Sequence, residues 1–183
     1  MNHVGTQYIE TDRLILRRFE RFDAQAMFDN WASDDEVTKY LTWPTHSDVS
    51  VTKQVLEDWV PQYAKDDCYR WAIILKRNGP QPIGSIDVVR WYEDGTVPVI
   101  GYCMGKRWWH QGIMTEALGT VIDFLFEQVG VDRIESYHDP NNPHSGDVMR
   151  KCGMKFEGIR EKSDRNNQGV CDTSHYSIEC GER

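Results

Sequence analysis

The sequence predicts one α/β (α+β) domain with a mixed, mostly antiparallel central sheet of about seven strands, flanking helices and a central βαβ crossover. The predicted order of elements is a strand, two helices, three strands, a helix, a strand, a helix and two strands. No repeat, low-complexity tract or long Pro-, Gly- or Ser-rich linker divides the chain, so one domain is expected over residues 1–183. A helix between two neighbouring strands implies a right-handed crossover, which gives the sheet its parallel pair.

The first half of the chain alternates short apolar runs with helical patterns. The expected elements are a strand over 13–19, helices over 23–32 and 48–65, and strands over 69–76, 82–91 and 97–104. Asp23 is the predicted N-cap of the first helix, and Pro61 disturbs the later part of the second. Turns are expected at "NGPQ", where Asn-Gly tolerates positive φ, and at "EDGT" (93–96).

The second half begins with a helix over 115–130, whose apolar positions form one broad face and which ends at Gly130. A strand over 132–139 follows, and then a short helix over 142–153 with Asn142 as its N-cap. The segments "KFEGIREK" and "CDTSHYSIEC" are expected to close the chain as a hairpin around "RNNQG".

Composition narrows the classes of function. The formal net charge of −8 argues against binding to duplex nucleic acid and fits a cationic or amine partner better. The five cysteines form no CxxC pair, which indicates reduced thiols in a cytoplasmic protein. No apolar run approaches the roughly 18 residues of a membrane span, and the N-terminus has no signal-peptide layout. No His, Cys, Asp or Glu cluster has zinc spacing, so neither a membrane nor a metal is expected.

The stretch "GYCMGKRWWHQGIMTEAL" (101–118) joins a predicted strand to a predicted helix. The first amides of a helix have no acceptor within the helix, and the helix dipole adds partial positive charge there. Because Gly112 gives room for close approach, the amides of residues 111–115 could hold a phosphate or pyrophosphate. A tight turn with no ligand explains this segment equally well when it is taken alone. Neither GxGxxG nor GxxxxGK[ST] is present, so nucleotide binding of those kinds is not indicated.

The second half of the chain, taken as a whole, favours a phosphate-binding role for residues 111–115 over a tight turn without a ligand. "IGYCMGKRWWHQGIMTEAL" followed by "HDPNNPHSGDVMRKCGMKFEG" resembles the GNAT superfamily of acyl-CoA-dependent N-acyltransferases. The chain looks most like the branch of ribosomal-protein N-terminal acetyltransferases (RimJ/RimL-like). The resemblance runs nearly from end to end, since "IETDRLILRRF", "EVTKYLTWP" and "CDTSHYSI" fit the branch in the right order. It implies the GNAT fold and acetyl-CoA as cosubstrate.

The resemblance also implies the cofactor-binding residues. The phosphate-binding pattern of the family is a Gln or Arg, any two residues, a Gly, any one residue, and a Gly or Ala. In this chain the pattern falls on residues 109–114. Gly112 matches the central glycine, while Trp109 and Met114 depart from the pattern at its two ends. The expected cofactor-binding set is Cys103, Met104, Gln111, Gly112, Ile113, Met114, Thr115, Asn142 and Ser145. Residues 111–115 would hold the pyrophosphate, and the backbone of Cys103 and Met104 would pair with the pantetheine arm like an added strand. Asn142 and Ser145 match the family's Asn-x-x-Ser motif facing the thioester.

Catalysis in this family is direct attack of an amine on acetyl-CoA, without a covalent enzyme intermediate. The Met104 amide is the expected oxyanion donor, and Ser145 is the expected donor to the leaving thiolate, because Met149 stands where many relatives have a tyrosine. Many relatives carry a Glu before strand four, where this chain has Val99. The candidate bases are therefore His138 first and Asp164 second, with deprotonation through water alone as the alternative.

The resemblance thus implies an acetyl-CoA-dependent N-acetyltransferase acting on a primary amine, either a protein N-terminus or a small molecule such as an amine antibiotic. A non-catalytic acyl-CoA-binding sensor or scaffold is the alternative, because the usual Glu and Tyr are missing. The acceptor pocket is expected around the first two helices and the final hairpin, with Trp31, Tyr40 and Trp43 as candidates. Relatives often pair as homodimers, although this chain does not reveal its own oligomeric state.

Overall fold

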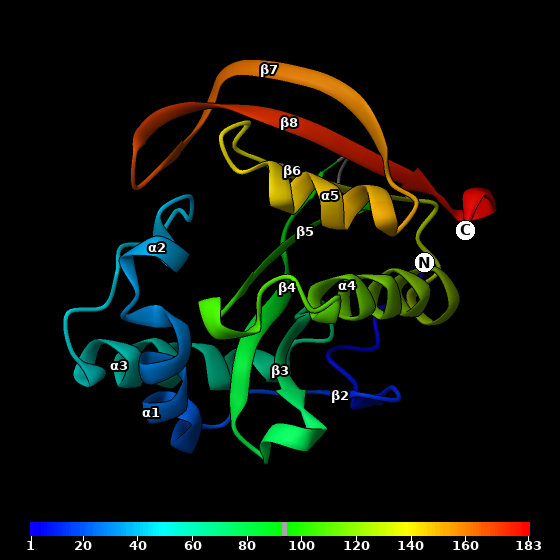
Figure 1. The fold of residues 1–183 in the computed structure, drawn as a ribbon. Coiled ribbons are helices and arrows are strands. Elements are labelled where there is room, and N and C mark those ends of the chain that lie inside the picture. The colour runs from blue at the N-terminus through cyan, green and yellow to red at the C-terminus, as the bar shows by residue number, and fades with distance from the viewer. Residues whose placement is uncertain (93–94) are drawn as a thin grey trace.

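A computed structural model describes residues 1–92 and 95–183 (Figure 1). The strands are β1 (Ile9–Glu10), β2 (Leu14–Arg17), β3 (Arg70–Leu75), β4 (Pro82–Tyr92), β5 (Val97–Met104), β6 (Arg133–His138), β7 (Lys155–Asn166) and β8 (Gly169–Glu179). The α-helices are α1 (Ala24–Met27), α2 (Asp35–Thr38), α3 (Val49–Trp59), α4 (Ile113–Phe124) and α5 (Pro143–Lys151). The predicted turn at 93–96 lies partly outside the described residues. No helix within the described ranges is long and apolar enough to span a membrane.

The strands form one mixed sheet in the order β1-β2-β3-β4-β5-β6-β8-β7. Of the strand pairs that the structure describes, only β5 with β6 is parallel, and α4 makes the crossover between them. The predicted fold class is therefore confirmed. The described residues contain eight strands rather than seven, because β1 folds back on β2 with Ile9 opposite Leu16. A two-residue strand is too short to show an alternating pattern in the sequence.

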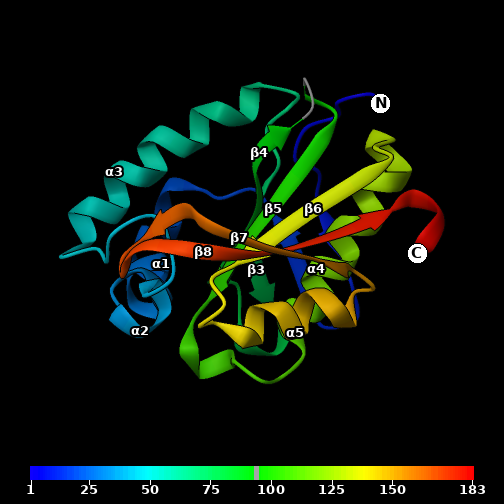
Figure 2. The same cartoon turned by 90° about the horizontal axis from the view of Figure 1, so that it is seen from above.

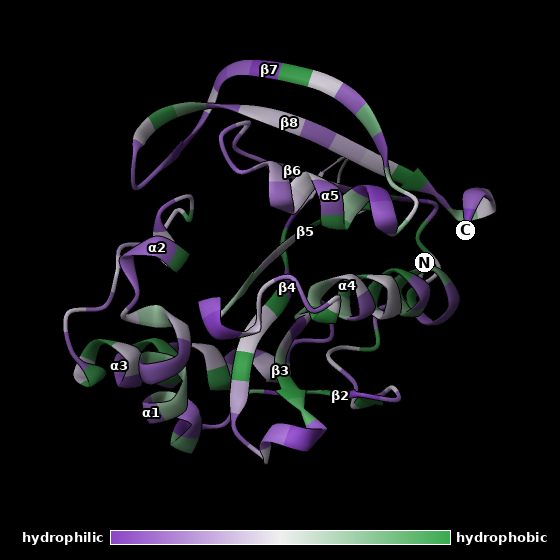
Figure 3. Cartoon of the chain, viewed as in Figure 1, coloured by the Kyte–Doolittle hydropathy of each residue, from purple (hydrophilic) through white to green (hydrophobic). Residues whose placement is uncertain are grey.

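Helices cover both faces of the sheet. Figure 2 shows α1–α3 and α4–α5 on opposite sides of the strands. Leu118 and Ile122 of α4 pack with Trp71 of β3 in the larger core, and Leu56 of α3 packs with Ile74 in the smaller one. Figure 3 shows the later part of β3 as strongly hydrophobic, as expected for a strand covered on both faces. Each face of the sheet therefore has its own buried core.

The first two predicted helices differ from the observed ones. The stretch 23–32 is a short α-helix followed by a π-helical turn over Phe28–Ala32, and α3 gives way to a 3₁₀ turn over Val60–Ala64 that contains Pro61. Asp23 occupies the predicted N-cap position of α1, but its side chain makes no cap hydrogen bond to this helix. The carboxylate instead accepts from the Glu20 amide at 2.8 Å and pairs with Arg17 at 2.7 Å.

Candidate functional site

A cavity opens where β5 and β6 separate. These strands pair at only two positions, Val99 with Glu135 and Ile100 with Ser136, and beyond them the strands diverge. The cavity measures about 510 Å³ and reaches from the start of α4 to the loop that follows α2. Its lining contains every predicted cofactor-binding residue, namely Cys103, Met104, residues 111–115, Asn142 and Ser145.

The α4 end of the cavity is built from backbone. Gly112 is the N-cap of α4 and has a φ of 70°, which a β-carbon would strain. The side chains of Ile113 and Met114 are buried in the core. These residues therefore meet the cavity mainly with backbone, and the N-terminal amides of α4 are free of helical acceptors. The departure at Met114 from the family pattern consequently leaves this end of the cavity open.

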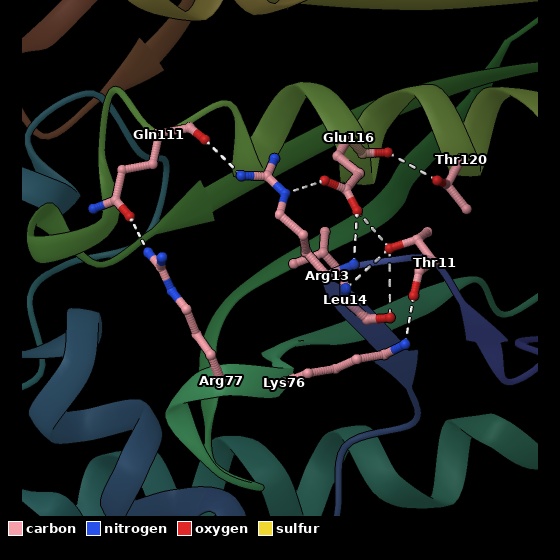
Figure 4. A network of polar contacts seen from close by, with 8 residues as sticks. All are labelled: Thr11, Arg13, Leu14, Lys76, Arg77, Gln111, Glu116 and Thr120. Atoms are coloured by element: carbon pink, nitrogen blue, oxygen red, sulfur yellow. Dashed lines mark hydrogen bonds and ion pairs between the residues drawn. The ribbon is translucent and has the colours of Figure 1, made fainter.

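A polar network fixes the loop before α4 (Figure 4). Arg13 donates from Nε to Glu116 at 2.6 Å and from Nη1 to the Gln111 carbonyl at 2.9 Å. Arg77 donates to Gln111 Oε1 at 2.9 Å, and Thr11 donates to Glu116 at 2.6 Å. Because the carbonyl and amide of a trans peptide point in opposite directions, the Gly112 amide points away from Arg13. Gln111 thus contributes to the site by orienting a peptide, while its side chain is held by Arg77.

The end of β5 presents amides that β4 does not use. The Gly105 amide donates to the Ile83 carbonyl at 2.9 Å, and such pairs alternate along an antiparallel ladder. The amides of Tyr102 and Met104 therefore point away from β4, toward the side where β6 has separated. The backbone of Cys103 was expected to pair with the pantetheine arm, but the same alternation directs its amide toward β4. Cys103 therefore lines the cavity with its side chain, whose thiol lies 3.4 Å from the Ser85 hydroxyl. Burial raises the pKa of this thiol to about 12.

The start of α5 holds Ser145 in a fixed position. Asn142 Nδ2 donates to Ser145 Oγ at 3.2 Å, and the Tyr102 hydroxyl donates to the Ser145 carbonyl at 2.8 Å. Since Oγ accepts the Asn142 bond, its own proton remains available to a group in the cavity. Asn142 occupies the N-cap position of α5 but makes no side-chain cap hydrogen bond, so its amide is used for Ser145.

His138 belongs to the cavity wall, but its basic nitrogen does not face the open space. Nδ1 lies 2.8 Å from the Asp139 carbonyl and must carry the proton of that bond, which leaves Nε2 as the acceptor. Nε2 is buried and has no hydrogen-bond partner among the described residues. A β-carbon on Gly146 would lie only 2.5 Å from it, so the ring packs against α5. Burial lowers the pKa of His138, and its role as base stays a prediction.

Asp164 lies on β7, outside the cavity lining. Its carboxylate accepts from the Tyr137 hydroxyl at 2.7 Å and from the Arg165 amide at 2.8 Å. Tyr137 does line the cavity, and burial and the Asp164 hydrogen bond raise the pKa of its hydroxyl. Asp164 therefore reaches the cavity only through Tyr137.

Asp87 is a site residue that the sequence analysis missed. It lies on β4 opposite Gly101 and lines the cavity on the face that carries α1–α3. Arg70 Nε is 3.5 Å from its Oδ2, and burial raises the pKa of Asp87 to about 6 despite this cation. A signal was present, because an acidic residue interrupts the apolar run "SIDVV" in the middle of a strand.

The far end of the cavity is aromatic. Tyr40, Trp43 and Trp59 line it, as was predicted for the first two. The prediction for Trp31 is wrong, because its side chain is 0% exposed and packs in the smaller core beside Phe19. The π-helical turn that contains Trp31 directs the ring inward, which the sequence pattern did not reveal.

Comparisons with known proteins agree on one family. Residues 13–155 match the profile of the acetyltransferase (GNAT) domain. The uncharacterized N-acetyltransferase YoaA of Bacillus subtilis is 29% identical over 170 residues, which cover 93% of this chain and 95% of YoaA. A GNAT-family acetyltransferase from Bacillus anthracis has a similar crystal structure, with a TM-score of 0.83, 23% identity and coverage of 96% of this chain and 100% of that one. RimL, a ribosomal L7/L12 α-N-protein acetyltransferase solved in complex with coenzyme A, gives a TM-score of 0.82 at 17% identity over 94% of this chain and 98% of RimL. At these identities, the solved structures establish the fold.

Proposed function

Because the chain belongs to the GNAT family of acetyltransferases, we propose that it transfers the acetyl group of acetyl-CoA to a primary amine by direct attack of the amine nitrogen. The relatives that match most of its length are named as N-acetyltransferases, which agrees with this reaction. Both acceptor classes expected from the sequence, a protein N-terminus and a small-molecule amine, offer such a nitrogen.

The observation that carries the proposal is the continuous cavity between β5 and β6. It joins the amides at the start of α4, the cavity-facing amides of Tyr102 and Met104, and the Ser145 hydroxyl. An anionic pyrophosphate fits the first of these groups, and an extended amide-containing arm fits the second. The residues present therefore suit acetyl-CoA, which supplies an activated thioester when it is bound.

The proposed chemistry assigns three tasks to the chain. The amide of Met104 or its neighbour Tyr102 stabilises the oxyanion that develops on the acetyl carbonyl, since fixed donors cost no reorganisation during the reaction. Ser145 donates a hydrogen bond to the departing sulfur, and Asn142 keeps the hydroxyl oriented for this. The proton of the acceptor ammonium goes to a base, for which His138 and Asp164 were the sequence candidates.

Calorimetric titration with acetyl-CoA and an assay of thiol release with a panel of amines test this proposal. Binding of acetyl-CoA together with amine-dependent thiol release is the expected result. Binding without release for every amine would favour the acyl-CoA sensor, and absence of binding would reject acetyl-CoA as the cosubstrate.

A further inference from the structure

The aromatic end of the cavity contains a carboxylate and is walled by a loop that Asn167 holds in place. Resting on the proposed function, we propose that the acceptor is a compact primary amine with an apolar body, whose ammonium group binds Asp87 and gives its proton to this carboxylate beside the loop that Asn167 holds. A protein N-terminus is thereby disfavoured. Three features of the structure support this inference.

The first feature is that Asp87 differs from the other acidic residues of the cavity. The carboxylates that line it are Asp87, Asp139 and Asp147. Asp139 accepts hydrogen bonds from Asn141 and Asn166, and Asp147 pairs with Arg150. The Asp87 carboxylate has one charged partner among the described residues, Arg70, whose Nε lies 3.5 Å from Oδ2. A largely buried carboxylate with a single, distant donor is a favourable partner for an ammonium group.

The position of Asp87 also suits a reaction at β5. Its Cα partner is Gly101, and the next residue along β5 is Tyr102, whose amide faces the cavity. Neighbouring strands lie about 4.8 Å apart, so an amine held by the carboxylate would be near that amide. Asp87 and Ser85 point to the face that carries α1–α3, whereas Ser145 lies on the face that carries α5. The acceptor and the thioester would therefore meet from opposite faces of the sheet.

The second feature is the size and character of the space. The whole cavity is about 510 Å³, whereas a site for one small ligand typically measures roughly 300–1,000 Å³. Here the acetyl-bearing arm shares this volume with the acceptor, which favours a small acceptor group at the site of reaction. Val37, Leu41 and the rings of Tyr40, Trp43 and Trp59 form its far wall. An apolar body on the amine would pack against these side chains, and aromatic faces also attract a cation.

The third feature is the bridge formed by Asn167, at the tip of the β7–β8 hairpin. Its amide donates to the Leu41 carbonyl at 3.1 Å, and Nδ2 donates to the carbonyls of Thr38 and Trp43, both at 2.8 Å. Figure 1 shows this tip reaching toward the α2 segment. These three bonds, termed the Asn167 bridge, tie the hairpin to the loop over 38–43. Leu41 and Trp43 of this loop line the cavity, so the bridge fixes a wall that a compact amine can pack against and that a longer peptide acceptor would have to pass.

In the proposed transfer, Asp87 takes one proton from the ammonium group, and the neutral amine forms its N–C bond to the acetyl carbon. The C–S bond breaks with its electron pair on sulfur, and a second proton from the amine nitrogen ends on that sulfur. The products are an N-acetylated amine and the free thiol of coenzyme A, and Asp87 returns its proton to solvent.

A comparison of acceptors tests the size limit. Phenethylamine, benzylamine and isopentylamine are assayed against the tetrapeptide amide Ala-Ala-Ala-Ala, with acetyl-CoA binding measured separately. We expect kcat/KM for the best small amine to exceed that for the tetrapeptide at least a hundredfold. The inference would be overturned, while the proposed function stands, if kcat/KM for the tetrapeptide came within tenfold of that for the best small amine. Acetylation of the tetrapeptide without acetylation of any small amine would overturn it as well. Failure of acetyl-CoA to bind would reject both.

Variants at Asp87 test the ammonium site. Asp87→Asn should raise KM for the amine more than tenfold and remove the acidic limb of the kcat/KM profile, and Asp87→Glu should restore part of both. The affinity for acetyl-CoA should not change. Asp67→Asn is the matched control, since Asp67 is exposed and lies outside the cavity lining. Charged or titratable groups that act on Asp87 are Arg70, Tyr63, Cys68 and Cys103, and these are unchanged in both variants. Identical behaviour of the Asp87→Asn and Asp67→Asn variants would overturn the assignment.

Variants at the hairpin tip test the bridge. Asn167→Ala removes the two side-chain bonds to the loop over 38–43, and Gln168→Ala is an exposed neighbouring control without such bonds. We expect the first variant to increase kcat/KM for the tetrapeptide relative to phenethylamine by at least threefold and the second to leave the ratio unchanged. An equal ratio in the two variants would show that the bridge does not limit the acceptor.

Discussion

Asp87→Asn should make the folded protein more stable at neutral pH, although it removes the proposed ammonium site. Burial raises the pKa of Asp87 from 3.8 to about 6, and this value already includes the opposing effect of Arg70. Each pKa unit corresponds to about 1.36 kcal/mol, so keeping the carboxylate ionised in the folded state costs up to about 3 kcal/mol at pH 7.5. Asparagine resembles the neutral acid in shape and avoids this cost.

The direction of the pH dependence follows from the raised pKa. Below pH 3.8, Asp87 is protonated in both the folded and the unfolded states and costs nothing. As the pH rises toward about 6, the unfolded state releases its proton first, so the wild type loses stability over that interval. The advantage of the asparagine variant should therefore grow from about 1 kcal/mol at pH 4.5 to about 3 kcal/mol at pH 7.5.

Urea denaturation of the wild type and of the Asp87→Asn and Asp67→Asn variants at these two pH values measures the effect. At pH 7.5 the expected gain corresponds to a rise in melting temperature of roughly 6–12 °C for a protein of this size. An Asp87→Asn variant no more stable than the wild type at pH 7.5 would refute the reasoning, as would an advantage that does not change with pH. Together with a loss of activity, the gain would identify Asp87 as a residue kept for function at the expense of stability.

Four further predictions concern the other groups of the site. Gly112→Val should weaken acetyl-CoA binding in calorimetry by roughly a hundredfold, because a branched side chain is strained at a φ of 70° and crowds the amides; unchanged affinity would contradict the proposed pyrophosphate site. Ser145→Ala should lower kcat roughly tenfold with unchanged acetyl-CoA affinity, and an unaltered kcat would remove Ser145 from the reaction. Arg13→Met should weaken acetyl-CoA binding about three- to tenfold by freeing the Gln111 carbonyl, and equal binding would show that the network in Figure 4 does not orient the loop. His138→Ala should leave the pH–rate profile superimposable if Asp87 takes the proton, whereas loss of an acidic limb below pH 6.5 would identify His138 as the base, since burial lowers its pKa.

The order of elements was readable from the sequence because each long element carries its own period. The helical pattern over 115–130 and the strand over 97–104 both appear close to their predicted bounds, as α4 with its following π-helical turn and as β5. Local patterns failed where tertiary contacts decide the structure. Asp23 has the residue type of an N-cap, yet the pair with Arg17 fixes its side chain elsewhere.

Local sequence patterns likewise predicted some contacts of the candidate site and missed those that depend on tertiary structure. Asn142 and Ser145 lie three residues apart at one helix start, so their proximity was predictable from spacing, and their hydrogen bond agrees with it. The direction of His138 was not predictable, because a strand sends alternate side chains to opposite faces and the sequence does not say which face is which. Tyr137 points to the face of Asp164, and His138 points to that of Gly146. Asp87 and Arg70 meet across two strands, and no local pattern reports such a contact.

The cofactor end of the site was easier to predict than the acceptor end because acetyl-CoA and the amine would be held by different kinds of groups. Apart from Gly112, whose positive φ disfavours a side chain, backbone amides at α4 and β5 can bind a pyrophosphate and an amide-containing arm with little dependence on the side chains they carry. The departures at Trp109 and Met114 therefore leave the fold and the cavity intact. The acceptor end depends on side chains, and these come from α2, the loop after it, α3 and β4, which are far apart in the sequence. The β7–β8 hairpin acts on this end through the bonds of Asn167 to that loop. A family can therefore keep its reaction while its members change their acceptors one side chain at a time. For this chain, Asp87 and the Asn167 bridge are the positions at which such changes would alter the acceptor first.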